Sequence, residues 1–338
     1  MLVLRRSDVE ELLDLDELLE ALARAHAELS AGAVSLPTRI AAYSGDAGLL
    51  GAMPAYLPSA GPWLEASSVE PTTPGRRSDA SGVLGCKLVT LFPGNADRPT
   101  HQAAIMLFDE TNGTPVALLD GTYVTEIRTA AAAALAARLL ARDDARILAV
   151  LGTGAQARMH LRTFAGIRDW DEVRVAGRDP AKAEALAADT GATAAATFEA
   201  AVRGADVVAA TTHADVPVVR RDWLAPGAHV SSVGYNQAGS ELDPAIVADA
   251  VIVVETRAVL APPPAGALEL AGLDESAIHA ELGELVAGTR PGRTSPEEIT
   301  LYKSVGVAVQ DLAAAALVLA TARERGAGVD IELEEIHV

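Results

Sequence analysis

Cysteine is almost absent from the 338 residues. Cys86 is the only one, so neither an internal disulfide nor a metal site built from several cysteines can form. Cys86 lies in the apolar run GVLGCKLVTLF, and we expect it to be a small buried side chain. The histidines lack metal-ligand spacing, and His101, His160, His213 and His229 are scattered. We therefore predict no bound metal and expect most of these histidines at the surface or in loops.

Positive charge is also scarce, with 27 basic residues against 46 acidic ones and a formal net charge of −19. Nucleic-acid binding needs clustered lysine and arginine, so this balance argues against such a partner. The alanine-rich run 129–145 is broken by charges, which is typical of a core helix and not of a membrane span. The N-terminal segment carries acids where a signal peptide has an apolar stretch. We expect a cytoplasmic protein without a membrane partner.

The first third of the chain predicts a helix followed by a β-rich region. Residues 7–31 have the pattern of an amphipathic helix, with Ser7 as the N-cap and Glu10 three places later. The polar segment 65–82 predicts a loop, and the Asn-Gly pair within 109–121 predicts a hairpin. Short runs of β-like composition, separated by Pro and Gly, lie at 39–43, 49–57, 83–92 and 102–110.

After Thr125 the pattern changes to alternating strands and helices. This alternation predicts an α/β fold with a doubly wound parallel sheet that is covered on both faces. A Gly/Pro-rich loop at 287–293 precedes the last long helix, which we predict over 301–326. The predicted strands are 146–151, 172–176, 206–210, 228–233 and 250–254.

The stretch RILAVLGTGAQARMH, residues 146–160, passes from a strand into a helix through Gly152, Gly154 and Ala157. In a dinucleotide-binding turn the first glycine makes the bend and the second lets the backbone approach the pyrophosphate. The third position packs helix against strand. The helix dipole and free N–H groups then stabilise the phosphate charge. The preceding strand and following helix supply the required context, so we favour a cofactor site over a purely structural turn.

The end of the second predicted strand bears on which cofactor is bound. Arg178 suits the 2′-phosphate of NADP, whereas Asp179 suits either the ribose of NAD or the N-cap of the next helix. We favour NADP and keep NAD as the alternative. Thr211 and Thr212 follow another predicted strand, where they line the cofactor crevice or simply cap the strand.

Several segments together resemble the ornithine cyclodeaminase/mu-crystallin family across nearly the whole chain. The family includes cyclodeaminases, alanine dehydrogenases, ketimine reductases and amino-acid synthases, so the resemblance is specific to the superfamily and less so to the reaction. The matching segments are LPTRI (36–40), MPAYL (53–57), GCKLVTLFPGN (85–95), TYVTEIRTAAAAALAA (122–137), LGTGAQARMH (151–160), VGYNQAGSELD (233–243) and YKSVGVAVQDLAAAALV (302–318).

The resemblance implies a split architecture and a homodimer. Residues 1–125 and 303–338 would form an α+β substrate-binding and dimerisation domain that the C-terminal helix completes. Residues 126–302 would form the Rossmann domain, with the substrate between the two. Val305 and Gly306 would contact the cofactor where the last helix enters the cleft. The expected cofactor contacts are Gly152, Gly154, Ala155, Gln156, Ala157, Arg178, Asp179, Thr211, Thr212, Val305 and Gly306.

Three cations, Arg39, Lys87 and Arg128, stand at positions that match the family. By resemblance they converge on the substrate carboxylate and the reacting carbon, and an arginine fork suits a carboxylate. Desolvation would lower the pKa of Lys87 enough for proton transfer to the substrate nitrogen. On alternation alone, Lys87 would instead lie on the solvent face of a strand, and Arg39 would be a surface charge. Arg128 is expected to open a helix, where the dipole disfavours a cation unless a ligand is bound.

Asn236 occupies the place where family cyclodeaminases carry an aspartate that handles water and amine steps. An amide is no general base, and Asp243 is too far along the loop to replace it. Both cyclodeamination and alanine dehydrogenation are therefore disfavoured. Reduction of a preformed imine needs only a carboxylate clamp, a proton source and a reduced nicotinamide. We predict an NAD(P)H-dependent reductase of cyclic α-imino acids, with ornithine cyclodeaminase, alanine dehydrogenase and a non-catalytic NADPH-binding protein as alternatives.

Overall fold

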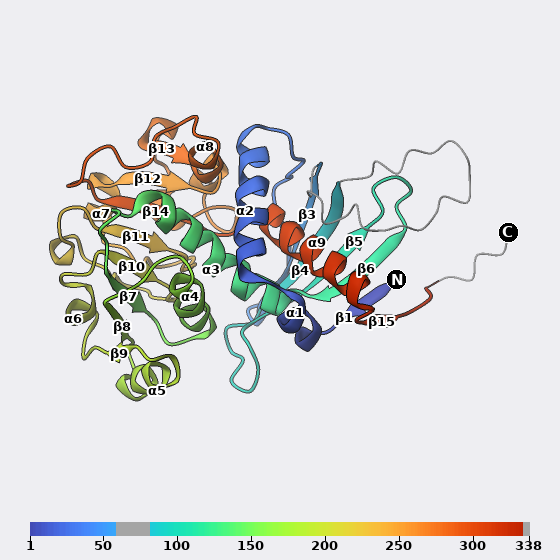
Figure 1. Cartoon of the computed structure of the whole chain (residues 1–338), viewed down its shortest axis with the longest axis horizontal. Coiled ribbons are helices and arrows are strands. Elements are labelled where there is room, and N and C mark those ends of the chain that lie inside the picture. Colours follow the sequence, from blue (N-terminus) through green and yellow to red (C-terminus); the bar gives the residue numbers. More distant parts are fainter. Residues whose placement is uncertain (59–81, 334–338) are drawn as a thin grey trace. The chain divides into compact units, whose positions relative to one another are not determined.

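The computed structural model describes residues 1–58 and 82–333. The chain divides into two compact units, drawn in Figure 1. Unit 1 comprises Met1–Arg128 and Val307–Val338, and unit 2 comprises Thr129–Gly306. The polar segment 65–82, which the sequence predicts as a loop, lies outside the described residues except for Gly82.

Unit 1 is built on a mainly antiparallel sheet, which in the described residues has seven strands in the order β15-β1-β6-β5-β4-β3-β2. The four predicted β-like runs are confirmed as β2 to β5, and the Asn-Gly hairpin is confirmed between β5 and β6. The elements are β1 (Leu2–Leu4), α1 (Arg6–Leu12), α2 (Leu15–Ser30), β2 (Ile40–Ser44), β3 (Gly48–Leu57), β4 (Val83–Leu91), β5 (His101–Phe108), β6 (Pro115–Asp120), the start of α3 (Gly121–Leu140), α9 (Ala308–Arg325) and β15 (Val329–Asp330).

Helix α9 forms the centre of the core of unit 1. It packs against α2 and against strands β3, β4 and β5, and Figure 1 shows α2 and α9 side by side over the sheet. The contact with β4 is close, because a Cβ placed on Gly85 would lie 2.7 Å from Cδ2 of Leu312. The side chains that point from β4 toward α9 are therefore sealed from water.

The predicted helix over 7–31 is wrong in detail, because the chain forms two helices there. The side chain of Asp14 accepts hydrogen bonds from the backbone of Asp16 and Glu17 at 2.9 and 3.0 Å and starts α2. The N-cap of α1 is Arg5 and not Ser7, and Asp8 at the third helical position accepts the backbone N–H of Arg5 at 2.8 Å. An aspartate in the middle of an amphipathic pattern thus begins a new helix.

Unit 2 is a doubly wound parallel sheet, which in the described residues has eight strands in the order β13-β12-β14-β11-β10-β7-β8-β9. The chain runs outward from β7 to β9 and then returns to the other side of β7 as β10, so the topological switch point lies between β7 and β10. The elements are β7 (Ile147–Leu151), α4 (Ala155–Ala165), β8 (Glu172–Ala176), α5 (Pro180–Thr190), β9 (Thr193–Ala194), α6 (Phe198–Val202), β10 (Val207–Ala210), η2 (Arg221–Trp223), β11 (His229–Ser232), α7 (Pro244–Asp249), β12 (Val251–Val254), η3 (Arg257–Leu260), η4 (Leu268–Leu270), η5 (Glu275–Ala277), β13 (Ile278–Glu281), α8 (Leu282–Val286) and β14 (Thr300–Lys303).

The five predicted strands of unit 2 are confirmed, but the start of the last predicted helix is wrong. Residues 300–303 form β14, which pairs with both β11 and β12 in the middle of the sheet. Gly306 then adopts a positive φ of 78°, and the helix begins only at Ala308. The turn at this glycine separates two apolar segments that read as one continuous helix in the sequence.

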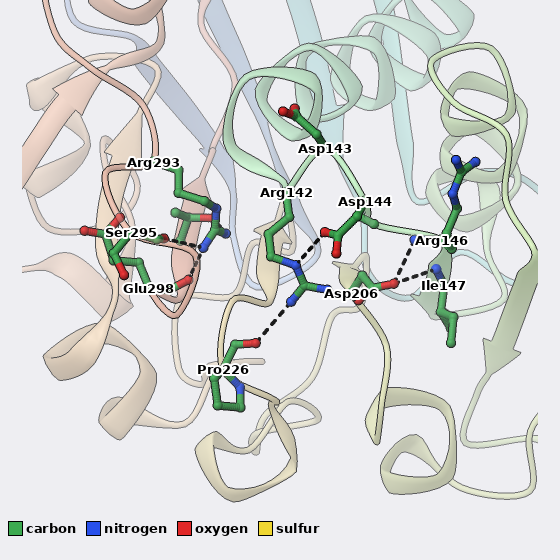
Figure 2. A network of polar contacts seen from close by, with 12 residues as sticks. Arg142, Asp143, Asp144, Arg146, Ile147, Asp206, Pro226, Arg293, Ser295 and Glu298 are labelled. Atoms are coloured by element: carbon green, nitrogen blue, oxygen red, sulfur yellow. Dashed lines mark hydrogen bonds and ion pairs between the residues drawn. The ribbon is translucent and has the colours of Figure 1, made fainter.

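The amino-terminal ends of β7 and β10 are joined by one carboxylate, that of Asp206 (Figure 2). It accepts the backbone N–H groups of Arg146 and Ile147 at 2.7 and 2.9 Å and pairs with Arg142 at 2.6 Å. Arg142 also pairs with Asp144 at 2.9 Å. This network anchors the amino-terminal ends of the two strands that flank the switch point. Ligands of such sheets bind at the opposite edge, at the carboxyl ends of the strands.

In the described part of the chain, no helix combines the length and apolar character needed to cross a lipid bilayer.

Candidate functional site

The glycine turn follows β7 as predicted. Gly152 has φ = 125°, and a Cβ at this position would lie 2.6 Å from Oγ1 of Thr211, so a side chain is excluded. Gly154 is the N-cap of α4, and a Cβ there would meet no protein atom within 4 Å. The fold itself therefore does not require a glycine at 154. An open backbone beside the first N–H groups of α4 is suited to a phosphate.

The first turn of α4 also contains the other predicted contacts of this motif. Ala155 is exposed, Gln156 is half-buried, and Ala157 is fully buried against the sheet. The small side chain at 157 lets α4 lie close to β7, as expected for the third position of the motif.

The end of β8 separates the roles of Arg178 and Asp179. One carboxylate oxygen of Asp179 accepts the N–H groups of Ala181 and Lys182 at 3.1 and 3.4 Å, which makes Asp179 the N-cap of α5. Arg178 is exposed, and no acid or other group among the described residues pairs with it. The guanidinium of Arg178 is thus available for an anion, while the carboxylate of Asp179 is engaged by the N-terminus of α5.

The buried carboxylate of Glu241 organises the ends of β10 and β11. It accepts the N–H and the hydroxyl of Thr212, both at 2.8 Å, and the Ser232 hydroxyl and Gly234 N–H, both at 2.7 Å. Thr211 donates its own hydroxyl to the carbonyl of Leu151 at 2.8 Å. Both threonines therefore take part in fixing the backbone at the switch point.

Lys303 at the end of β14 is a second buried charged residue that links the segments of this region through hydrogen bonds. Its Nζ donates to Gly234 O at 2.7 Å, to Ser232 Oγ at 3.1 Å and to Glu269 Oε1 at 3.1 Å. Three residues later, Gly306 makes the turn described above. Between them, the N–H of Val305 donates to buried Glu255 at 2.9 Å.

Asn236 is held by the loop after β10 and by its own loop. Its amide nitrogen donates to Ala214 O at 3.2 Å and to Asp215 Oδ1 at 2.8 Å, and its oxygen accepts the N–H of Ala238 at 2.9 Å. Asp243 is likewise engaged, because it caps α7 by accepting the N–H of Ala245 at 3.0 Å. The side chains that the sequence suggested for chemistry in this loop thus shape the loop in the structure.

In unit 1, Lys87 lies on the face of β4 that α9 covers and is only 2% exposed, so it does not lie on a solvent face. Its Nζ is 2.6 Å from Oδ2 of Asp311 and 3.4 Å from Oγ1 of Thr125. Burial is the largest influence and lowers the pKa of Lys87 to about 8, although Asp311 opposes this shift. A lysine with this pKa is able to donate a proton near neutral pH.

Arg128 does not open a helix, as the sequence suggested, because α3 begins seven residues earlier at Gly121. The dipole argument therefore does not apply. The guanidinium is buried and pairs through Nε with Oδ1 of Asp311 at 2.8 Å and through Nη1 with Oε1 of Gln310 at 2.6 Å. In the described residues no protein group accepts from Nη2 of Arg128, which leaves that nitrogen for an anion.

Arg39 precedes β2 and is half-buried. Its charge and that of Arg128 both lower the pKa of Lys87, so the three cations lie in one electrostatic neighbourhood. We call Arg39, Lys87 and Arg128 the cation cluster. Its net positive charge suits a carboxylate, and its lysine suits proton transfer to a neighbouring atom.

Sequence reasoning missed Asp311 and Gln310, which hold the cluster from α9. His26 of α2 extends the network, because Gln310 Nε2 donates to its Nε2 at 2.9 Å. Burial and the charge of Arg128 lower the pKa of His26 to about 4, so this ring is neutral. The signal for the missed pair was a Gln-Asp dipeptide inside an otherwise apolar helix, because buried polar groups require partners.

The predictions of surface histidines and of a buried Cys86 are partly wrong. His160 and His229 are fully buried, and desolvation lowers their pKa values to about 4 and about 3. Cys86 is half-buried on the face of β4 opposite Lys87, where burial still raises the pKa of its thiol. His101 and His213 are exposed as expected.

Comparison with known proteins adds a family to this geometry. The profile of the ornithine cyclodeaminase/mu-crystallin family matches residues 69–326. The ketimine reductase mu-crystallin of Mus musculus is 36% identical over 293 residues, which cover 85% of each protein. The Δ1-pyrroline-2-carboxylate reductase of Thermococcus litoralis, solved with NADH and L-proline, has a TM-score of 0.85 and 32% identity, with 98% of this chain and 100% of that one covered. An archaeal alanine dehydrogenase dimer with bound NAD has a TM-score of 0.83 and 29% identity over 99% of both chains.

Proposed function

Since the chain belongs to the ornithine cyclodeaminase/mu-crystallin family, we propose that it reduces a cyclic α-imino acid, such as pyrroline-2-carboxylate or piperideine-2-carboxylate, to the cyclic amino acid. The observation that carries the proposal is the buried Lys87, with a pKa of about 8, beside Arg128 and Arg39. The reaction names of the mouse and Thermococcus relatives support the same class of chemistry.

The two arginines supply the substrate clamp. Arg128 binds the α-carboxylate through the Nη2 group that its protein partners leave open, and Arg39 adds a second positive charge from the segment before β2. Asp311 pairs with both Lys87 and Arg128, so one protein carboxylate faces two cations of the cluster. A clamp of this kind orients the carbon next to the carboxylate.

Lys87 is the proton donor. Its protonated Nζ transfers a proton to the imine nitrogen, which makes the adjacent carbon a better hydride acceptor. The bound reduced nicotinamide supplies the hydride for that carbon. Gly152, Gly154 and the first turn of α4 are the residues that fit the cofactor pyrophosphate, on the evidence of the open backbone at Gly154.

The loop after β11 favours reduction over cyclodeamination. Glu241 accepts four hydrogen bonds, Asp243 caps α7, and the amide nitrogen of Asn236 is engaged by the loop after β10. None of these groups is placed as a free base for activating water or an amine. A preformed imine requires no such base.

We infer that the cofactor is NADPH in preference to NADH. Asp179 is occupied as the N-cap of α5, whereas Arg178 is exposed and has no partner among the described residues. This combination favours a 2′-phosphate over a ribose diol. Arg178→Ala is expected to raise KM for NADPH by about tenfold or more and to change KM for NADH much less. An equal change for both cofactors would contradict the assignment.

We also infer a homodimer from exposed apolar side chains on one face of the sheet in unit 1. Leu84 and Leu88 project from β4 on the side opposite Lys87, and Leu50 of β3 lies on the same face. Leu88 is 43% exposed, and an apolar sheet face of this kind usually meets a partner. Leu88→Glu should shift the mass measured by sedimentation from dimer to monomer. A wild-type chain that sediments as a monomer would overturn this part of the proposal.

One assay panel tests the reaction. The wild-type chain is incubated with each cyclic imine and NADPH, while nicotinamide absorbance and ammonia are followed together. We expect NADPH oxidation without ammonia release. Ammonia from ornithine at constant NADPH would identify a cyclodeaminase, and tight NADPH binding without turnover would identify a binding protein.

A further inference from the structure

Asp311 is the one acid that the described structure places against two members of the cation cluster. Its Oδ2 lies 2.6 Å from Nζ of Lys87, and its Oδ1 accepts from Nε of Arg128 at 2.8 Å. The carboxylate has no exposed surface, and α9 holds it in the core of unit 1. A buried carboxylate shared by two cations fixes the position of both.

The charge state of Lys87 depends on burial and on groups from three other segments. Burial, Arg128 on α3 and Arg39 before β2 all favour the neutral amine. Asp311 on α9 is the group that favours the ammonium, through its charge and its contact with Nζ. His26 on α2, which joins the network through Gln310, is neutral and adds no charge.

We propose that Asp311 is a positioning residue that keeps Lys87 charged as the proton donor and holds the guanidinium of Arg128 in its carboxylate-binding orientation. The inference rests on the proposed function, because only a reaction that needs a proton makes the charge on Lys87 important. Asp311 itself is enclosed by its two partners and contacts no substrate in this assignment.

Asp311 also acts electrostatically on Lys87 both before and after the proton transfer. The positive charge moves from Nζ of Lys87 to the imine nitrogen, and the neutral amine of Lys87 then regains a proton from water. The carboxylate of Asp311 pairs with Lys87 before the transfer and attracts the returning proton after it. An amide at this position would keep a hydrogen-bonding group but lose the charge.

Direct titration of Lys87 tests the inference without any substrate. The chain has three lysines, Lys87, Lys182 and Lys303, so ¹³Cε-labelled lysine gives three signals that single Lys→Arg variants assign. In the full-length protein we expect the Lys87 midpoint to lie near 8 and to fall by about 1–3 pH units in Asp311→Asn. An unchanged midpoint in Asp311→Asn would overturn the proposal.

Kinetics provide the second readout. In Asp311→Asn the alkaline limb of the kcat/KM profile should move to lower pH together with the Lys87 midpoint. A uniform loss of activity with an unmoved limb would indicate a merely structural role and would contradict the proposal. Asp189→Asn, which removes an exposed acid paired with Arg158 at 3.0 Å, is the matched control and should leave the limb in place.

Asp311→Glu keeps the charge and serves as the second variant if the asparagine protein does not fold. The Lys87 midpoint should stay near the wild-type value, while KM for the imine rises severalfold because the longer side chain displaces Arg128. A wild-type KM in this variant would contradict the positioning of Arg128. If the wild-type chain reduces no imine but Asp311→Asn still shifts the Lys87 midpoint, the proposed function fails while the electrostatic role of Asp311 stands.

Discussion

Two of the three lysines are fully or almost fully buried, one in each unit, and their surroundings differ. Lys303 in unit 2 donates to three acceptors within 3.1 Å, one of them the carboxylate of Glu269. Lys87 in unit 1 has one close acid, Asp311, a longer contact to Thr125 at 3.4 Å, and two arginines nearby.

The contrast between Lys87 and Lys303 shows that burial alone does not define the role of a lysine. An ammonium whose three N–H groups all reach acceptors is a cross-link between strands and loops. An ammonium with one acid and two neighbouring cations is held close to losing its proton. Four tests examine this contrast between Lys87 and Lys303, in decreasing order of expected effect.

The strongest test replaces the buried Lys87 with arginine. Lys87→Arg preserves the positive charge beside Asp311, but a guanidinium does not release a proton at neutral pH. Imine reduction should therefore fall by about 10²–10⁴-fold, measured as kcat/KM with NADPH. Lys182→Arg at the exposed third lysine is the control and should retain activity. Normal turnover in Lys87→Arg would remove Lys87 from its role as proton donor.

The second test concerns stability. Lys303→Met leaves the buried carboxylate of Glu269 without its cation, which should lower the free energy of unfolding by about 3–5 kcal/mol. Urea denaturation followed by circular dichroism measures this change, and Lys182→Met on the surface should stay within about 0.5 kcal/mol of the wild type. A stable Lys303→Met protein with lost turnover would reverse the roles assigned to the two lysines.

The third test uses pH. The folded-state pKa of Lys87 is about 8 against an ordinary value of 10.5, so the unfolded chain binds the proton more tightly. Stability should therefore rise with pH between these values by on the order of 3 kcal/mol relative to Lys87→Met, which lacks the group. Unfolding free energies at pH 7.5, 9 and 10.5 measure the difference. A constant difference in unfolding free energy between the wild type and Lys87→Met across this pH range would mean that the pKa of Lys87 is not lowered by folding.

The smallest effects are expected from the hydroxyl neighbours. Thr125→Val removes the 3.4 Å contact to Lys87 and should change kcat/KM by less than about threefold, since a contact of this length contributes little. Ser232→Ala removes a donor to Glu241 as well as an acceptor for Lys303. It should cost about 1–3 kcal/mol of stability, measured by urea denaturation. Equal losses of stability in Thr125→Val and Ser232→Ala would weaken the distinction between the surroundings of Lys87 and those of Lys303.

Composition and the order of elements predicted most of this fold. Strands β3 to β5 were recognised by their β-like composition between Pro and Gly, and the βαβ rhythm around Gly152 gave the parallel sheet. The failure at β14 has a local cause, because the residues before and after Gly306 are mostly apolar and the conformation of this glycine separates strand from helix. The resemblance to the family is confirmed by the profile match.

The site was less accessible to prediction than the fold. Lys87 and Arg128 were identified through their family positions, but Asp311 lies 183 residues after Arg128, and only folding brings the two together. The orientation of Lys87 toward α9 also required the structure, since alternation alone does not say which face is covered. Long-range pairs of charged residues are set by packing, which local patterns do not encode.

The position of α9 after unit 2 in the sequence has a consequence for biosynthesis. Most of the sheet of unit 1 leaves the ribosome before unit 2, yet α9 follows the whole of unit 2. The nascent sheet must therefore wait, with Lys87 and Arg128 lacking their counterion, until α9 has emerged. A polypeptide stopped just after Gly306 would carry the complete parallel sheet of unit 2 but an unfinished unit 1, and termination before the end of α9 should yield an inert product.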